Sequence, residues 1–242
     1  MLIIKLDAID STNDYLKALA KKQVLENFTT VTANYQTKGK GQMGAKWLSE
    51  PGKNLTMSVL LKDVLVNNSA IFNLNVAVAL SIITVLDSMN ISKVSIKWPN
   101  DIMADTKKIG GILIENSLKS GGTITSIIGI GLNVNQTDFS QLPKASSLVL
   151  ETKQEQNRED VAQKILEQLQ LFVAMVNTQP DFLWQRYHER LFKNGIPMAF
   201  EAANGNQFMG IIQHVSLDGQ LHLLLEDDTT QSYSVKEIKM LF

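Results

Sequence analysis

The sequence predicts an α+β protein that ends in a small, separate β-structure. Apolar residues recur at helical spacing over 71–89 and 158–176, so each stretch can bury one face of a helix. Around these helices, β-branched and apolar runs are typical of strands, and they lie at 29–35, 55–61 and 124–132. A chain that mixes both element types in this way is expected to pack helices against a sheet.

The last part of the sequence changes to closely spaced short strands. These strand-like runs lie at 198–203, 207–214, 220–226 and 231–235. Turn signals separate them, for example Asn204-Gly205 and Leu217-Asp218-Gly219. Such a pattern indicates a small β-barrel, so we expect one domain at 1–192 and a second at 193–242.

The helices carry their own start signals. Ser11 precedes the first periodic stretch and Asp14 follows three residues later, as in a capping box. Asn157 is suited to cap the helix at 158–176, and Pro180 suits the first turn of the helix after it. Polar residues interrupt the apolar stretch 71–89, which argues against a membrane span.

Composition limits the function classes. The formal net charge is −1, so no global field attracts nucleic acid. Cysteine is absent and the three histidines lack ligand spacing, which argues against disulfides and a zinc site. The apolar start of the chain is too short for a signal peptide. We therefore expect a cytoplasmic protein that binds neither membranes nor DNA.

A polar hairpin is the most informative segment. Lys97-Trp98-Pro99-Asn100-Asp101 follows a strand-like run, and Lys108 lies seven residues after the aspartate. The turn signal Asp105-Thr106-Lys107 brings Lys108 back toward the end of the sheet that carries Asp101. An amine beside a carboxylate suits the handling of a phosphate with its metal. An ordinary hairpin with a solvated turn remains the alternative on local pattern alone.

A glycine loop lies between the first two strand-like runs. Residues 39–44 match G-x-G-x-x-G, but the residues after them contain Pro51 and Gly52 and lack the helix that a dinucleotide site needs. The loop carries Lys38, Lys40 and Lys46, with Trp47 as an anchor. We expect freed backbone N–H groups and amines to wrap a phosphate and to close over a reactive intermediate. A solvated surface hairpin is the alternative.

Four segments in this order resemble the signature motifs of the biotin protein ligase family. They are Asp10-Ser11-Thr12-Asn13, the loop from Tyr35-Gln36 to Lys46-Trp47, the stretch from Lys97 to Glu115, and Ile130-Gly131-Leu132-Asn133-Val134-Asn135. The loop departs from the arginine-rich pattern of many members, because Lys40, Gln42, Met43 and Ala45 occupy the arginine positions. Lysine keeps the charge but lacks the bidentate fork of arginine.

The resemblance implies both a fold and an activity. The implied fold is a biotin–lipoate ligase catalytic domain with a mixed sheet, similar to class II aminoacyl-tRNA synthetases, followed by an SH3-like barrel. The implied enzyme is a biotin–[acetyl-CoA-carboxylase] ligase that uses ATP and Mg²⁺ to form biotinyl-5′-AMP. It then transfers biotin to a lysine of a biotin carboxyl carrier domain. The ligase signature begins within ten residues of Met1, which implies the monofunctional type without a DNA-binding domain.

The resemblance also assigns roles to individual residues. The catalytic residues are Lys108, Asp101 and Asn100, with Asn100 orienting Asp101; Asp101 is open to Mg²⁺ binding or to proton acceptance. The residues implied for biotin are Ser11, Thr12, Asn13, Gln36, Lys40, Gly41, Gln42, Lys108 and Gly111. The residues implied for ATP or the adenylate are Gly39, Lys40, Gly41, Gln42, Trp47, Asn100, Lys108 and Asn133.

Two other functions stay open at this point. A lipoate–protein ligase shares the catalytic fold, but its R-R-x-S-G-G-G motif is not in this sequence. A catalytically silent biotin-binding module would not need Lys108, Asp101 and the glycine loop. A homodimer is left open as well, because no residue pattern decides the oligomeric state.

Overall fold

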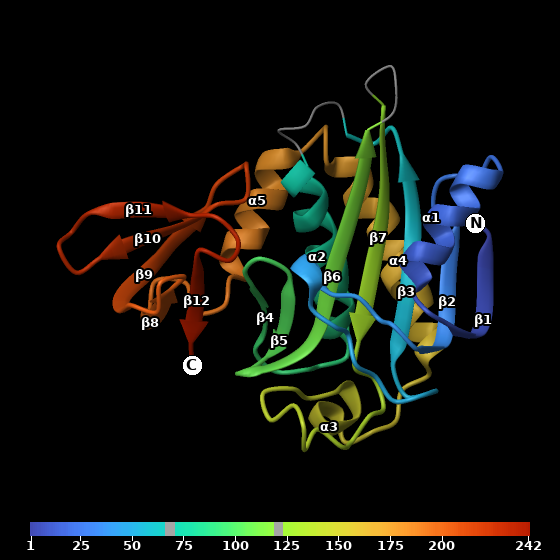
Figure 1. Cartoon of the computed structure of the whole chain (residues 1–242), viewed down its shortest axis with the longest axis horizontal. Coiled ribbons are helices and arrows are strands. Elements are labelled where there is room, and N and C mark those ends of the chain that lie inside the picture. The colour runs from blue at the N-terminus through green and yellow to red at the C-terminus, as the bar shows by residue number, and fades with distance from the viewer. Residues whose placement is uncertain (66–70, 119–122) are drawn as a thin grey trace.

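The computed structural model describes residues 1–65, 71–118 and 123–242. Its centre is a mixed sheet with the strand order β1-β2-β3-β7-β6-β5-β4 (Figure 1). The strands are β1 (Ile3–Ile9), β2 (Thr30–Gln36), β3 (Leu55–Lys62), β4 (Val94–Lys97), β5 (Asp101–Ala104), β6 (Lys107–Leu118) and β7 (Ile124–Leu132). β1 pairs with β2 in parallel, whereas the other neighbours are antiparallel. The predicted α+β class with a mixed sheet is confirmed.

Helices cover both faces of this sheet. α1 (Thr12–Lys22) packs on β2, β3 and β7, while α2 (Ile71–Ser88), α4 (Arg158–Met175) and α5 (Pro180–Glu189) form the other layer (Figure 1). By length and composition α2 could cross a membrane, yet 67% of it is buried inside the protein. Its apolar residues are therefore accounted for by packing between the sheet and α4.

The predicted helix starts are confirmed. The Ser11 side chain accepts a hydrogen bond from the Asp14 N–H, and Asn157 accepts from the N–H groups of Glu159 and Asp160. Pro180 begins α5. Five elements of the described chain were not predicted, namely β1, the 3₁₀ turn at Gln42–Gly44, β5, the short helix α3 (Leu148–Thr152) and β12 (Ile238–Leu241).

The predicted barrel at the end of the chain is wrong in one respect. The strands β8 (Pro197–Ala202), β9 (Gln207–Val215), β10 (Leu221–Leu225) and β11 (Thr230–Tyr233) do form, and together with β12 they make an antiparallel sheet of order β11-β10-β9-β8-β12. Closure would require β11 to pair with β12. Within the described residues β11 and β12 are the two edges of the sheet, and the isolated bridge Val235↔Ile238 lies in the segment that connects them, so the C-terminal sheet stays open.

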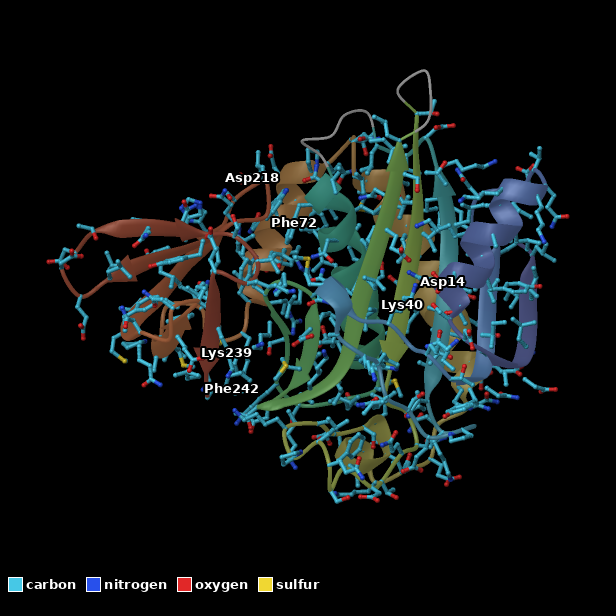
Figure 2. All side chains as sticks on the ribbon, viewed as in Figure 1. Asp14, Lys40, Phe72, Asp218, Lys239 and Phe242 are labelled. Carbon is cyan, nitrogen blue, oxygen red and sulfur yellow. The ribbon has the colours of Figure 1, made fainter. Side chains whose placement is uncertain are left out.

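The C-terminal sheet is fastened to the central sheet at the predicted polar hairpin. Trp98 Nε1 donates a 2.9 Å hydrogen bond to the carbonyl oxygen of Gly219. Phe72 of α2 lies against this same turn, next to Asp218 (Figure 2), and a Cβ at residue 219 would be 2.3 Å from the Phe72 ring. Gly219 also has a φ of +87°, so a larger residue would be strained there. The turn therefore holds the hairpin and the C-terminal sheet together.

Candidate active site

The strands β4, β5 and β6 form an antiparallel meander that brings three charged side chains together. Lys97 pairs with Asp101 in register, and Met103 pairs with Lys108 after a bulge. As a result, Lys108 Nζ lies 2.5 Å from Asp101 Oδ1, and Lys97 Nζ lies 3.6 Å from Asp101 Oδ2. The predicted return of Lys108 to Asp101 is confirmed. The contact of Lys97 with the same carboxylate was not foreseen.

Asn100 fastens the turn before β5 to strand β6. Its Nδ2 donates a 2.6 Å hydrogen bond to the carbonyl oxygen of Ile112, and its own carbonyl accepts from the Ile112 N–H at 3.0 Å. Among the described residues, no hydrogen bond joins its side chain to Asp101. The side chain and main chain of Asn100 therefore both bond to Ile112 of β6, and the expected orienting of Asp101 stays a prediction.

A cavity of about 240 Å³ lies over the middle of the sheet. Its lining contains most of the predicted site: Ser11, Thr12, Asn13, Gln36, Lys40, Gly41, Gln42, Trp47, Asn100, Asp101, Lys108 and Gly111. The structure thus gathers residues from the start of α1, the end of β2, the glycine loop and the hairpin. We call this space the first cavity.

One end of the first cavity is a buried polar network. Gln36 Oε1 accepts hydrogen bonds from the Thr12 N–H at 2.8 Å and the Thr12 hydroxyl at 3.0 Å. Asn13 accepts from the Ser58 hydroxyl at 2.5 Å and donates to Glu115 at 2.9 Å. Sequence reasoning missed Ser58 and Glu115 as members of this network. A serine inside the apolar strand run 55–61 was the available signal, because buried polar groups need partners.

Glycines in β6 and β7 make room for the walls of this cavity. A Cβ at Gly129 would lie 2.6 Å from Asn13 Oδ1, and a Cβ at Gly131 would lie 2.5 Å from Trp47 Cε2. The Trp47 ring therefore lies directly on β7, and Lys108 Nζ is 5.6 Å from the ring centroid. Trp47 Nε1 is buried without a hydrogen-bond partner among the described residues. A ligand acceptor at this atom would remove the cost of that unsatisfied N–H.

The glycine loop folds back over the first cavity. The Trp47 N–H donates to the Gly39 carbonyl at 2.9 Å, and a 3₁₀ turn at Gln42–Gly44 replaces the helix of a dinucleotide site. Lys40 Nζ lies 2.6 Å from Asp14 Oδ2 of α1. Both residues are labelled beside α1 in Figure 2. The hydrogen bond to Asp14 raises the pKa of Lys40, so this amine stays protonated near neutral pH. A cation is thus held at the rim of the first cavity.

Two predicted residues lie outside the first cavity. Gly39 is in the part of the loop that faces a neighbouring groove. Asn133 is 5% exposed and its Nδ2 donates to the Ser146 carbonyl oxygen at 2.9 Å, so it fixes the chain beyond β7. It also lines a second cavity of about 540 Å³. This second cavity shares Lys46, Trp47, Asp101 and Lys108 with the first, so Lys108 stands between the two spaces.

The charged groups at this junction do not form a metal site by themselves. Within the described residues there is no group of three or more histidine or acidic side chains that could hold a metal ion. Asp101 is the one acidic side chain that lines the two cavities, and two ammonium groups already contact it. Protein sites for Mg²⁺ usually combine carboxylates with substrate phosphates. The arrangement instead suits an anionic ligand beside Lys108.

Comparison with known proteins agrees with the motifs. Residues 6–135 match the model of the biotin/lipoate A/B protein ligase family. The bifunctional ligase/repressor BirA of Bacillus spizizenii is 31% identical over 241 residues, which cover 96% of this chain and 72% of that protein. The Escherichia coli protein of the same name is 35% identical over 129 residues, but these span only 39% of its length.

Further relatives carry the names of biotin ligases. The biotin–[acetyl-CoA-carboxylase] ligase of Mycobacterium tuberculosis is 27% identical over 88% of this chain and 79% of its own. The structure of the Aquifex aeolicus biotin protein ligase in complex with biotin and ATP superposes with a TM-score of 0.80. It is 25% identical and covers 99% of this chain and 98% of that one. On the motifs, the fold and these matches, the chain belongs to the biotin/lipoate A/B protein ligase family.

Proposed function

We propose that this protein is a biotin–[acetyl-CoA-carboxylase] ligase. It joins biotin and ATP to form biotinyl-5′-AMP, and it then transfers biotin to a lysine of a biotin carboxyl carrier domain. The observation that carries the proposal is the position of Lys108 between two adjoining cavities. An amine at that junction can contact a carboxylate in one space and a phosphate in the other.

The first cavity suits biotin. A cyclic urea presents two N–H donors and one carbonyl acceptor, and the end formed by Thr12, Asn13 and Gln36 offers both kinds of partner. The apolar sulfur-containing ring would lie along the surface of Gly129 and Trp47. The valerate chain would then point its carboxylate toward Lys108.

The second cavity suits ATP. Asn133 and Lys46 line it together with apolar side chains such as Met103 and Leu142, which can cover a base. ATP is used as its Mg²⁺ complex, and its own phosphates provide the ligands of the ion. Asp101 is therefore assigned to the protein side of the site rather than to a resident metal.

The chemistry follows from this placement. In the first step a biotin carboxylate oxygen bonds to the α-phosphorus while the bond from that phosphorus to the β-bridging oxygen breaks, and pyrophosphate leaves. Lys108 neutralises two anions that would otherwise repel each other as they meet. In the second step the acceptor amine attacks the biotinyl carbonyl carbon and AMP leaves. Asp101, the one carboxylate that lines both described cavities, accepts the proton of that amine.

Transfer to an acceptor tests this proposal. The protein is incubated with MgATP, a purified biotin carboxyl carrier domain, and either biotin or lipoate. The mass of the carrier domain is then measured by mass spectrometry. We expect one biotinyl adduct and no lipoyl adduct. A lipoyl adduct would favour the lipoate ligase alternative. Biotin binding without any adduct would indicate a silent binding module.

The cellular part of the proposal is a cytoplasmic location. A biotin carboxyl carrier domain and ATP meet this protein there, and the chain has no cysteine that an oxidising compartment would pair. Fractionation of cells with an antibody against the protein tests this location, and recovery with the membrane pellet would contradict it.

A further inference from the structure

The Asn13 side chain lies on the sheet between two polar side chains that are outside the first cavity. In register, Ser58 of β3 pairs with Gly129 of β7, and a Cβ at Gly129 would be 2.6 Å from Asn13 Oδ1. Glu115 of β6 is on the same face of the sheet, because it is two residues from Leu113, the other register partner of Gly129. Figure 1 shows β3, β7 and β6 side by side. The bare surface of Gly129 thus leaves room for the Asn13 amide.

Two partners fix which way round the Asn13 amide lies. A carboxylate only accepts hydrogen bonds, so Glu115 Oε2, at 2.9 Å, selects the NH₂ group of Asn13. The Ser58 hydroxyl, at 2.5 Å, donates to the amide oxygen. Ser58 is 0% exposed and Asn13 is 3% exposed, so bulk water does not replace the hydroxyl. A flipped amide would turn its oxygen toward the carboxylate, and two acceptors would face each other.

The same serine also contacts Thr12 and, through it, Gln36. The Ser58 hydroxyl lies 2.7 Å from Thr12 Oγ1, and the one hydrogen of the Thr12 hydroxyl points to Gln36 Oε1. Thr12 Oγ1 can therefore only accept from a ligand, and Gln36 is left with Nε2, which can only donate. The second hydrogen of Asn13 Nδ2 is a further donor. This end of the first cavity thus offers donors and an acceptor in fixed places.

We infer that Ser58 and Glu115 are positioning residues that make this end of the first cavity specific for a cyclic urea, which rests on the proposed function because the biotin ring must lie there. A urea oxygen accepts from the donors on Gln36 and Asn13, while a urea N–H donates to Thr12. Neither positioning residue lines the first cavity, so both act through Thr12 and Asn13. The dithiolane ring of lipoate has no such groups and would leave these buried polar atoms without partners.

The test compares Glu115→Ala, Glu115→Gln and Ser58→Ala with two matched controls. Lys17→Met removes the ion-pair partner that lies 3.3 Å from Glu115 Oε1, and it leaves the hydrogen bond to the amide in place. Ser126→Ala removes the hydroxyl of another buried serine in the same sheet, which lines neither cavity.

Calorimetry gives the affinities for biotin, for desthiobiotin, which keeps the urea but lacks the sulfur ring, and for AMP, which has no urea. Steady-state adenylate formation gives kcat and KM for biotin. We expect Glu115→Ala and Ser58→Ala to bind both ureas about tenfold more weakly, which corresponds to about 1.4 kcal/mol. KM for biotin should rise by the same factor while kcat is kept, because the urea takes no part in the reaction.

The conservative variant separates orientation from charge. Glu115→Gln keeps an acceptor for the Asn13 amide, so its affinity for biotin should stay within about twofold of wild type, as should that of both controls. AMP affinity should match wild type in every variant, since AMP does not contact the urea end. The Glu115 variants decide alone if Ser58→Ala melts below the assay temperature.

Every other result counts against the two positioning residues or against the proposed function. Wild-type affinity for biotin in Glu115→Ala would overturn the inference, as would a Glu115→Gln variant as weak as Glu115→Ala. Weaker AMP binding in the same variants would indicate a general distortion, and a loss for biotin but not for desthiobiotin would indicate a contact with the sulfur ring; either would overturn it. A protein that binds both ureas in the expected pattern, yet forms no adenylate, would leave the inference standing and overturn the proposed function.

Discussion

Replacing Lys108 with alanine should abolish most of the adenylation activity while leaving the fold intact. The variant removes the amine that lies 2.5 Å from Asp101 and at the junction of the two cavities. Loss of one positioned electrostatic contact to a transition state costs about 2.7–4 kcal/mol, or about 10²–10³ in rate. We therefore expect the rate of biotin-dependent exchange of pyrophosphate into ATP to fall by that factor.

Stability should change far less than the rate. The Lys108 side chain is 38% exposed and Asp101 keeps Lys97 at 3.6 Å, so the lost pair contributes at most about 1 kcal/mol. For a chain of this size that corresponds to a Tm shift of about 2–4 °C. Calorimetric melting of the variant checks this number and shows whether a loss of rate reflects unfolding.

The neighbouring lysine provides the control. Lys107 is exposed at the start of β6 and lines neither cavity, so Lys107→Ala should exchange pyrophosphate at the wild-type rate. Lys108→Arg keeps the charge but not the shape of the amine, and its rate should lie between those of wild type and alanine variant. An exchange rate for Lys108→Ala within about twofold of wild type would refute the mechanism, because the expected effect on such a contact is far larger.

Three further outcomes are expected. Gly129→Ala places a methyl group 2.6 Å from Asn13 Oδ1. KM for biotin should therefore rise at least about tenfold, while KM for ATP stays unchanged. Parallel changes in both constants would count against biotin binding at the Asn13 end of the first cavity. Trypsin should cut the glycine loop at Lys38, Lys40 or Lys46 in ligand-free protein. Biotin plus ATP should slow these cuts, because an adenylate would hold the loop closed. Identical digestion patterns with and without the ligands would argue against a closing loop. The chain has 23 basic and 24 acidic residues, so it lacks the net positive charge that attracts DNA. A gel-shift titration should therefore show no sequence-specific complex with DNA. A sequence-specific shift would disprove that expectation.

The sequence predicted the parts of the site that depend on local geometry. Ser11 caps α1 through a hydrogen bond to the Asp14 N–H, three residues away. Lys108 returns to Asp101 because a tight turn links β5 to β6. Contacts of this range follow from spacing and turn chemistry, which a single sequence contains.

Long-range contacts could not be predicted in the same way. The bond from Asn13 to Glu115 crosses from α1 to β6, and the position of Lys239 in the second cavity depends on how the C-terminal sheet docks. Closure of that sheet depended on whether two edge strands meet, and no local pattern specifies this. The hydrogen bond from the Asn100 side chain to the main chain of Ile112 could not be predicted from spacing either, because it joins a turn to the next strand.

The most direct test of the account is to isolate the intermediate. Purified protein is incubated with biotin and ATP labelled at the α-phosphate, passed rapidly through a desalting column, and the bound label is identified by chromatography. We expect labelled biotinyl-5′-AMP that stays with the protein, that fails to form when lipoate replaces biotin, and that is lost in Lys108→Ala. Bound AMP or ATP alone, or an adenylate that forms equally well with lipoate, would contradict it.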